Sequence, residues 1–351
     1  MSTPKKQRLA ILLFPILLLC SCGGGSSPTA ATVIPPVVPV DYTPTSARLA
    51  QQPLLDDLKA LSAPELGGRK LGSPGNETAR AFLEQRFTTL GLSHLGASFR
   101  QAFTSPRGNG INVVGYLQGT QFPTEYILLT AHFDHIGIRN GQVMCGADDN
   151  ASGTAAVLHL AEYLKNHPPA RTVVFCLFDG EEAGLLGSEA FASEPPAPIT
   201  LAKIKVVLNL DMIAQGTQGR IFVGGTSFTA SLKPHLLSAF ATSKVAVVPD
   251  FEKYDAQSDQ GPFLDRGVPF LFFCVGDDDP YYHTVNDTYE RIPKVFYWAT
   301  VEAILETFLR LDAQTSLPIS QAPMREIAPF SVRWNPDLWR RKLNESTPPS
   351  E

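Results

Sequence analysis

The segment YILLTAHFD, residues 126–134, is an apolar run that ends in polar residues. It is followed by GADDNASG (146–153) and by residues 153–166, whose apolar positions recur with helical spacing until Pro168. A second apolar run then covers residues 172–178. This order predicts a strand at 126–130, a helix at 153–166 and another strand at 172–178.

The same reasoning extends to both sides of this unit. Strands alternating with helices predict an α/β fold, a three-layer sandwich around a mostly parallel, mixed sheet. The further predicted strands are 111–117, 206–210 and 268–275, and the further predicted helices are 76–90 and 296–311.

The N-terminus has the pattern of an export signal. Lys5, Lys6 and Arg8 precede an apolar run at 9–19, which is too short to span a bilayer. Ser21 followed by Cys22 resembles a bacterial lipoprotein signal, so we expect residues 1–21 to be removed and Cys22 to carry a lipid. Lipidation would anchor the chain to a membrane of the bacterial cell envelope, in the periplasm or at the cell surface. The alternative is an ordinary secretory signal with incidental cysteines.

Composition divides the rest of the chain into three parts. Residues 22–45 are Pro-rich and read as a tether between the anchor and a folded domain at 46–312. Residues 313–351 form a Pro-rich C-terminal extension, in which Trp334 and Trp339 predict that a part packs down.

Charge and cysteine content exclude two classes of protein. A net charge of -5 gives no basic field for nucleic acid, so no nucleic-acid partner is expected. Three cysteines follow Cys22, and Cys176 and Cys274 lie in apolar strand-like runs. Buried thiols are therefore expected, with a disulfide in an oxidising compartment as the alternative and Cys145 left without an assigned role, and the chain is not a disulfide scaffold. The oligomeric state stays open.

Chemically versatile residues follow several predicted strands. His132, Asp211 and the pair Glu181-Glu182 each come just past the carboxyl end of a strand, the edge where open α/β sheets bind ligands. Nitrogen and oxygen donors in this mixture suit zinc, and a Glu beside a ligand Glu suits hydrolysis. The sequence has no His-Glu-x-x-His, Gly-x-Ser-x-Gly or Walker motif, which excludes the enzyme classes built on them.

A series of short motifs runs along residues 66–292: GR (68–69), SPGN (73–76), AHFD (131–134), GADDNASG (146–153), FDGEEAGLLGS (178–188), NLDM (209–212), SDQGPF (258–263) and YHTVNDT (282–288). In these motifs and their order, the segment resembles the zinc aminopeptidases of peptidase family M28, and the resemblance implies a zinc-exopeptidase-like fold. One position departs from the family pattern: Gln260 stands where a His is common, which casts doubt on any role for that position.

The resemblance implies a site for two zinc ions, with five protein ligands. Asp149 would bridge both ions, which lie roughly 3.5–4 Å apart in such sites and repel each other unless a carboxylate lies between them. His132 and Asp211 would complete one zinc, and Glu182 and His283 the other.

The resemblance also implies two catalytic carboxylates outside the ligand set. Glu181 would be the general base. Asp134 would accept the ring N–H of His132 and so fix its tautomer.

Neighbouring polar residues are expected to play smaller parts. Asp148 is expected to be a loop carboxylate and His135 a residue of the rim, outside the first shell or facing solvent. His159 falls away from the apolar face of its helix, so we expect it to be exposed. The acidic run 277–279 is expected to be solvated, with attraction of a substrate's amino terminus as the alternative.

The function that follows is zinc-dependent removal of N-terminal residues from peptides. The alternatives are a glutaminyl-cyclase-like zinc acyltransferase, which uses one zinc, and a non-catalytic surface binding protein. Ligands for both metals favour the peptidase. Loops at 223–227 and 251–257 would line the pocket for the N-terminal side chain. Residue specificity, and carboxypeptidase or dipeptidase action on the same centre, stay open.

Overall fold

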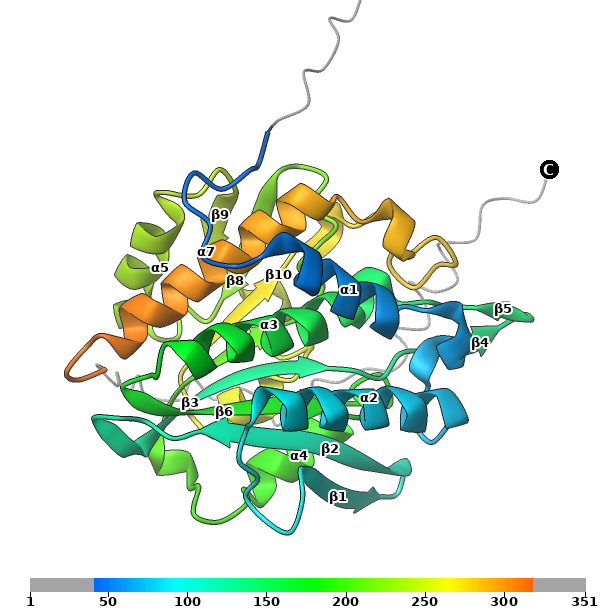
Figure 1. The fold of residues 1–351 in the computed structure, drawn as a ribbon, viewed down its shortest axis with the longest axis horizontal. Helices are drawn as coiled ribbons and strands as arrows, with labels where there is room; N and C mark the ends of the chain where they lie inside the picture. The colour runs from blue at the N-terminus through cyan, green and yellow to red at the C-terminus, as the bar shows by residue number, and fades with distance from the viewer. Residues whose placement is uncertain (1–40, 318–351) are drawn as a thin grey trace, which may run out of the picture. The chain divides into compact units, whose positions relative to one another are not determined.

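A computed structural model of the chain describes residues 41–317, which fold around one eight-stranded sheet (Figure 1). The signal peptide, Cys22, most of the tether and both tryptophans of the tail lie outside the described residues. The strand order is β1-β2-β6-β3-β7-β10-β8-β9. The strands are β1 (Arg100–Ser105), β2 (Gly108–Leu117), β3 (Phe122–His132), β6 (Arg171–Phe178), β7 (Ile204–Leu210), β8 (Arg220–Gly224), β9 (Ala246–Pro249) and β10 (Phe270–Cys274), with a separate hairpin of β4 (Ile138–Arg139) and β5 (Gln142–Val143).

The sheet is mixed, with a parallel centre. β3 pairs in parallel with β6 and β7, and β7 pairs in parallel with β10. On one side β2 runs antiparallel to β6, and on the other β8 runs antiparallel to β10. The carboxyl ends of the four central strands therefore meet at one edge, which confirms the predicted fold class.

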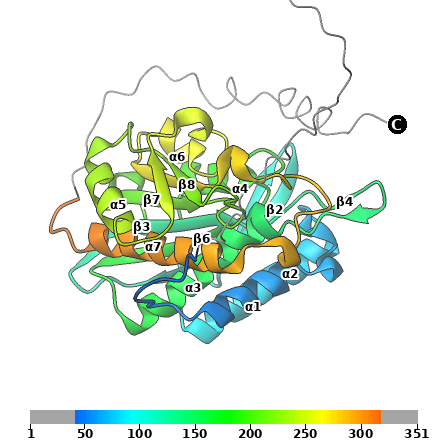
Figure 2. The ribbon, with the colours of Figure 1, turned by 90° about the horizontal axis from the view of Figure 1, so that it is seen from above.

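Helices cover both faces of the sheet (Figure 2). The face that carries Leu129 is covered by α1 (Gln51–Leu61), α2 (Pro74–Leu90), α3 (Gly153–Asn166) and α7 (Lys294–Asp312), with α5 (Lys233–Phe240) beside α7. The opposite face, which carries Leu128, is covered by α4 (Leu186–Ser193) and α6 (Gly261–Asp265). Successive residues of β3 thus enter different cores, which explains why residues 126–129 are all apolar.

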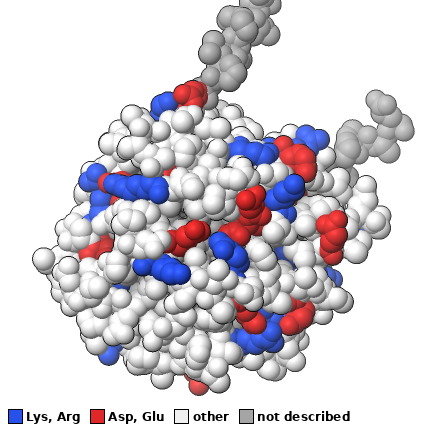
Figure 3. Space-filling model, in the orientation of Figure 1, with Lys and Arg blue, Asp and Glu red and all other residues white. Residues whose placement is uncertain are grey.

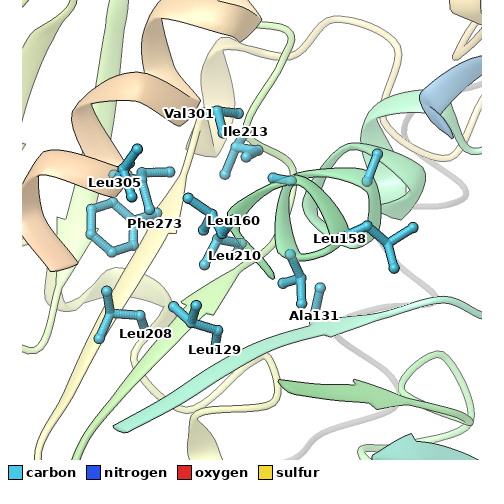
Figure 4. Packing of buried hydrophobic residues seen from close by; sticks show 14 of the residues in the cluster. Leu129, Ala131, Leu158, Leu160, Leu208, Leu210, Ile213, Phe273, Val301 and Leu305 are labelled. Atoms are coloured by element: carbon cyan, nitrogen blue, oxygen red, sulfur yellow. The ribbon is translucent and has the colours of Figure 1, made fainter. Parts of the chain in front are cut away.

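The larger core joins α3 and α7 to the sheet. Figure 4 shows Leu160 of α3 and Leu305 of α7 beside Leu208, Leu210 and Phe273 of the central strands, all fully buried. Burying one such side chain stabilises the fold by about 1.5–3 kcal/mol. This packing fixes the strands whose ends carry the polar residues.

Local signals set the ends of α2. Ser73 accepts the N–H of Asn76 at 3.2 Å as the N-cap, Pro74 takes the first turn, and Gly91 ends the helix in a left-handed conformation with φ 69°. The prediction of a helix at 76–90 is therefore confirmed, with a start two residues earlier.

His159 corrects one prediction. It is only 3% exposed, because α1 covers the side of α3 that lies opposite the predicted apolar face. Burial lowers its pKa. Because α3 is buried over most of its circumference, the apolar face seen in the sequence did not predict which of its residues are exposed.

The remaining surface and thiol features are simple. Cys176 and Cys274 are free and buried, as expected, and Cys145, which had no assigned role, is free and buried too. On the face shown in Figure 3, positive and negative side chains are interspersed. Within residues 41–317, no helix has the length and apolarity that a membrane span requires.

Candidate metal centre

The polar residues that follow the central strands come together at the carboxyl edge of the sheet. His132 ends β3, Asp211 follows β7 directly, and Glu181 and Glu182 follow β6 after a short turn. His283 reaches the same place from the loop after β10.

Asp149 lies between the two histidines. Its Oδ1 is 3.4 Å from Nε2 of His132, and its Oδ2 is 3.0 Å from Nε2 of His283. Nε2 of His132 is also 3.2 Å from an oxygen of Asp211, and Nε2 of His283 is 3.2 Å from an oxygen of Glu182. Each oxygen of Asp149 thus faces a separate His–carboxylate pair, so the structure brings all five predicted ligands together.

The donor atoms fall into two groups, and those of each group lie within 4.8 Å of one another. One group is His132, Glu181 and Asp211; the other is His135, Asp149, Glu182 and His283. Both offer buried imidazole nitrogens and carboxylate oxygens, a donor set that fits zinc.

Of the two places predicted for His135, the structure shows the one beside the predicted ligands. It is fully buried, with Nδ1 2.8 Å from an oxygen of Glu182 and 3.7 Å from Oδ2 of Asp149. The expectation that it faces solvent is wrong. Gly146 admits the ring, since a Cβ at that position would lie 2.6 Å from the imidazole. A glycine next to a ligand motif was the signal that could have indicated a close side chain.

Mutual electrostatics govern protonation here. Burial opposes charge on His283 and Glu182, yet their attraction raises the pKa of His283 to about 10 and lowers that of Glu182 to about 2. Burial also opposes the imidazolium of His132, but Asp211 and Glu181 raise its pKa well above the usual value. Protons on these histidines occupy the places that a cation would take, so metal binding should release them.

Glu181 has a different environment. Burial raises its pKa well above the usual value, although His132 favours its anion. Glu181 is 7% exposed, and its carboxylate lies near the donor atoms of His132 and Asp211. A carboxyl group with a raised pKa is suited to exchange protons near neutral pH.

Asp134 joins the loop after β3 to the loop after β6. Its carboxylate accepts the N–H of Glu181 at 3.0 Å and of Glu182 at 3.3 Å. Nδ1 of His132 lies 3.1 Å from the backbone oxygen of Asp134 and 3.6 Å from its carboxylate. Asp134 therefore orients Glu181 and Glu182 together, and its backbone contacts the His132 ring more closely than the predicted carboxylate does.

Asp148, like Asp134, accepts backbone N–H groups from a neighbouring loop. Its carboxylate accepts the N–H groups of Ala214 at 2.7 Å and Gln215 at 3.2 Å, close after Asp211. It lies outside both donor groups, in line with a loop carboxylate. Burial, together with nearby carboxylates, raises its pKa well above the usual value.

Two other positions are resolved by their contacts. Gln260 accepts a hydrogen bond from the Asn209 side chain at 2.8 Å and donates one to the backbone of Tyr254 at 2.9 Å, so it ties the adjoining loop to β7. The run 277–279 is not solvated as a whole: Asp278 pairs with Arg220 at 2.8 Å, and Asp279 is 7% exposed. Only the first residue of this run is exposed.

Arg69 is a residue to which the sequence assigned no role. Its fully buried guanidinium donates to the backbone oxygens of Phe133 at 2.8 Å, Cys145 at 2.7 Å and Gly146 at 3.0 Å. It thereby joins the loop after His132 to the loop before Asp149. The Gly68-Arg69 motif can be recognised in the sequence, but the hydrogen-bond partners of Arg69 can be identified only in the folded structure.

Comparison with known proteins gives the family. The model of peptidase family M28 matches residues 112–308, more than half of the chain. The chain belongs to peptidase family M28. Within this family, aminopeptidase YwaD of Bacillus subtilis is 29% identical over 242 residues, which are 66% of this chain and 50% of that protein. The M28 chain therefore spans about half the length of this relative.

Solved structures share the fold of this M28 chain. BSAP, a zinc aminopeptidase from Bacillus subtilis, has a TM-score of 0.61 and 15% identity, covering 75% of this chain and 95% of that one. The glutaminyl cyclase of Porphyromonas gingivalis has a TM-score of 0.63 and 17% identity, covering 75% and 99%. At these identities the likeness shows the fold alone, and the fold is common to both activities.

Proposed function

We propose that this M28 domain is a zinc-dependent aminopeptidase that removes N-terminal residues from peptides. The observation that carries the proposal is the placement of Asp149, whose two oxygens face two separate His–carboxylate pairs. One carboxylate in that position supports a centre with two metal ions.

Each side chain has a role in this proposal. His132 and Asp211 would hold one zinc, Glu182 and His283 the other, and Asp149 would bridge them. When bound, zinc makes hydroxide available near neutral pH and polarises the scissile carbonyl. Glu181 would take the proton of the attacking water and pass it to the leaving amine, a task that its raised pKa suits.

Substitution of the base tests the mechanism. Glu181→Gln should lower kcat on an aminoacyl-arylamide about 10²–10⁴-fold, because the amide cannot accept the proton. Glu302→Gln is the matched control, since Glu302 is a buried glutamate of α7 that accepts backbone N–H groups of residues 48 and 49. Full activity of Glu181→Gln would rule out this role.

Metal content and product separate the peptidase from the cyclase. About two zinc ions per chain support the aminopeptidase, and about one supports a glutaminyl-cyclase-like acyltransferase. A peptide with N-terminal glutamine should be hydrolysed at its first peptide bond; ammonia release with a cyclised product would support the cyclase. A chain that binds metal but turns over neither substrate would support a non-catalytic binding protein.

We also propose that the chain is lipid-anchored in the bacterial cell envelope through Cys22, on the basis of the Ser21-Cys22 signal. Cys22→Ala should move the protein from the membrane to the soluble fraction and abolish labelling with a fatty-acid analogue. Cys20→Ala is the control and should change neither. Equal membrane retention of both variants would contradict the anchor.

A further inference from the structure

Asp287 makes an unusual set of contacts with the loop that carries Asp149. It is fully buried; its Oδ1 accepts the N–H of Asp148 at 2.7 Å and its Oδ2 that of Asp149 at 3.1 Å. Its backbone oxygen lies 3.3 Å from the N–H of Ala147. Three successive amides therefore point at one residue, and hydrogen bonds to a charged acceptor are about twice as strong as neutral ones.

Asp287 belongs to the same turn as His283. Its N–H donates to the backbone oxygen of Thr284 at 3.3 Å, and the N–H of Thr284 donates to that of Tyr281 at 2.9 Å. The imidazole of His283 meets Oδ2 of Asp149 at 3.0 Å. Both the backbone and the side chain of Asp149 are thus held by this one turn.

Arg69 completes the restraint from the other side. It binds the backbone oxygens of Cys145 and Gly146, while Asp287 binds the amides that follow. Segment 145–149 is therefore held at both ends: Arg69 binds its first carbonyl groups, and Asp287 binds its last N–H groups. Little freedom remains for the carboxylate of Asp149.

We propose that Asp287 is a positioning residue that sets the bridging carboxylate of Asp149 relative to His283. The inference rests on the proposed two-metal function. Its consequence is selective: loss of one of the two acceptor oxygens of Asp287 weakens the metal held by His283 and Glu182 more than the metal held by His132.

The chain contains a matched control at the opposite end of the sheet. Asp312, at the end of α7, accepts the N–H of Ala170 at 2.6 Å and of Arg171 at 2.9 Å. It is a buried aspartate that caps two successive amides in the same way. Because β6 runs from this point to Phe178, the cap lies about 23 Å from the metal edge.

The experiment compares Asp287→Asn and Asp312→Asn in the otherwise unchanged chain. Metal-free proteins are titrated with Zn²⁺ against a chromogenic chelator, and with Co²⁺ while the absorption and the magnetic coupling between the two cobalt ions are followed. Asp287→Asn should bind the second metal about 10–100-fold more weakly and lose the coupling signal. Asp312→Asn should keep both affinities within about twofold.

Two results would overturn the inference: unchanged binding of both metals by Asp287→Asn, or an equal loss in Asp312→Asn. If Asp287→Asn does not fold, Asp287→Glu, which keeps both acceptor oxygens on a longer side chain, enters the same titration with the same two criteria. Wild-type protein that binds one metal or hydrolyses no arylamide contradicts the proposed function itself. Active wild-type protein with two metals, beside an unaffected Asp287 variant, contradicts only the positioning role.

Discussion

The arrangement of the candidate metal centre also depends on residues that do not contact the predicted ligand side chains, and Arg69 is an example. Besides the backbone oxygens of Phe133, Cys145 and Gly146, its guanidinium donates to the backbone oxygen of Leu61. Within residues 41–317, no carboxylate lies at salt-bridge distance from this guanidinium. Gly68 makes room for this segment, because a Cβ there would lie 2.5 Å from the backbone oxygen of Gly137. Only a guanidinium, with several N–H donors in one plane, can donate to acceptors that lie in different directions.

Arg69→Lys should lower both stability and zinc affinity. The ammonium cannot reach all of the carbonyl groups, and buried acceptors left without donors should cost about 2–4 kcal/mol in the free energy of unfolding. Arg171→Lys is the control, since Arg171 is equally buried but pairs with Glu125 at the far end of β6. Urea unfolding should show a loss in both variants, and chelator competition a loss of zinc affinity in Arg69→Lys alone. Equal zinc affinity in the two variants would limit Arg69 to a structural role.

The predicted ligand residues lie together because each follows a strand, and strand ends can be recognised in a sequence. The partners of Arg69, Asp287 and His135 could not be predicted in that way. Arg69 meets Phe133 and Gly146, which are more than 60 residues away, and only the packed loops bring them close. Ligand identity is thus a local property of the sequence, whereas the orientation of each ligand is a tertiary one.

At the level of elements, long apolar segments were predictable and short ones were not. The central strands and α2, α3 and α7 were identified because both sheet faces are buried and the helices are long. β8 and β9 have five and four residues, and their short sequences carry little periodicity. Their formation depends on β10, against which β8 pairs.

Leu160→Ala should test whether α3 supports the centre only through packing. A cavity in this fully buried position should cost about 2–5 kcal/mol in urea unfolding. Leu237→Ala, at a position 42% exposed, should cost less than about 0.5 kcal/mol. The folded fraction of Leu160→Ala should retain two zinc ions per chain. A lower zinc content in that fraction would show that α3 also transmits strain to the ligands.

At the scale of the whole molecule, buried acids dominate the pH response of the metal-free chain. Burial raises the pKa of Asp179, Asp259 and Asp287 to about 7, whereas their unfolded values lie near 3.8. The folded chain therefore binds more protons than the unfolded chain between these values, so its stability falls as pH rises through that window. His283 acts in the same direction at higher pH, because its contribution is lost as pH rises towards its folded pKa of about 10.

Metal-free protein should accordingly be most stable near pH 5. Its Tm in EDTA should fall by about 5–10 °C between pH 5 and pH 8. Below about pH 4 stability should fall as well, because the pKa of Glu182 is lowered to about 2 and its favourable charge is lost on protonation. Saturating zinc should reverse the trend between pH 5 and pH 8, since the metal replaces protons at the site. Scanning calorimetry with and without zinc measures both curves, and a metal-free Tm that rises from pH 5 to pH 8 would contradict the assignment.

The five proposed ligands are spread between residues 132 and 283, His132 at the end of β3 and the others outside the strands, so no single element or loop carries the whole set. A newly made chain cannot present a high-affinity site until the last of these loops has docked, and the ion then stabilises only molecules that have finished folding. A chain that holds its metal with high affinity has therefore folded completely. A preparation's zinc-to-protein ratio should report the fraction of native molecules directly, without any measurement of catalysis.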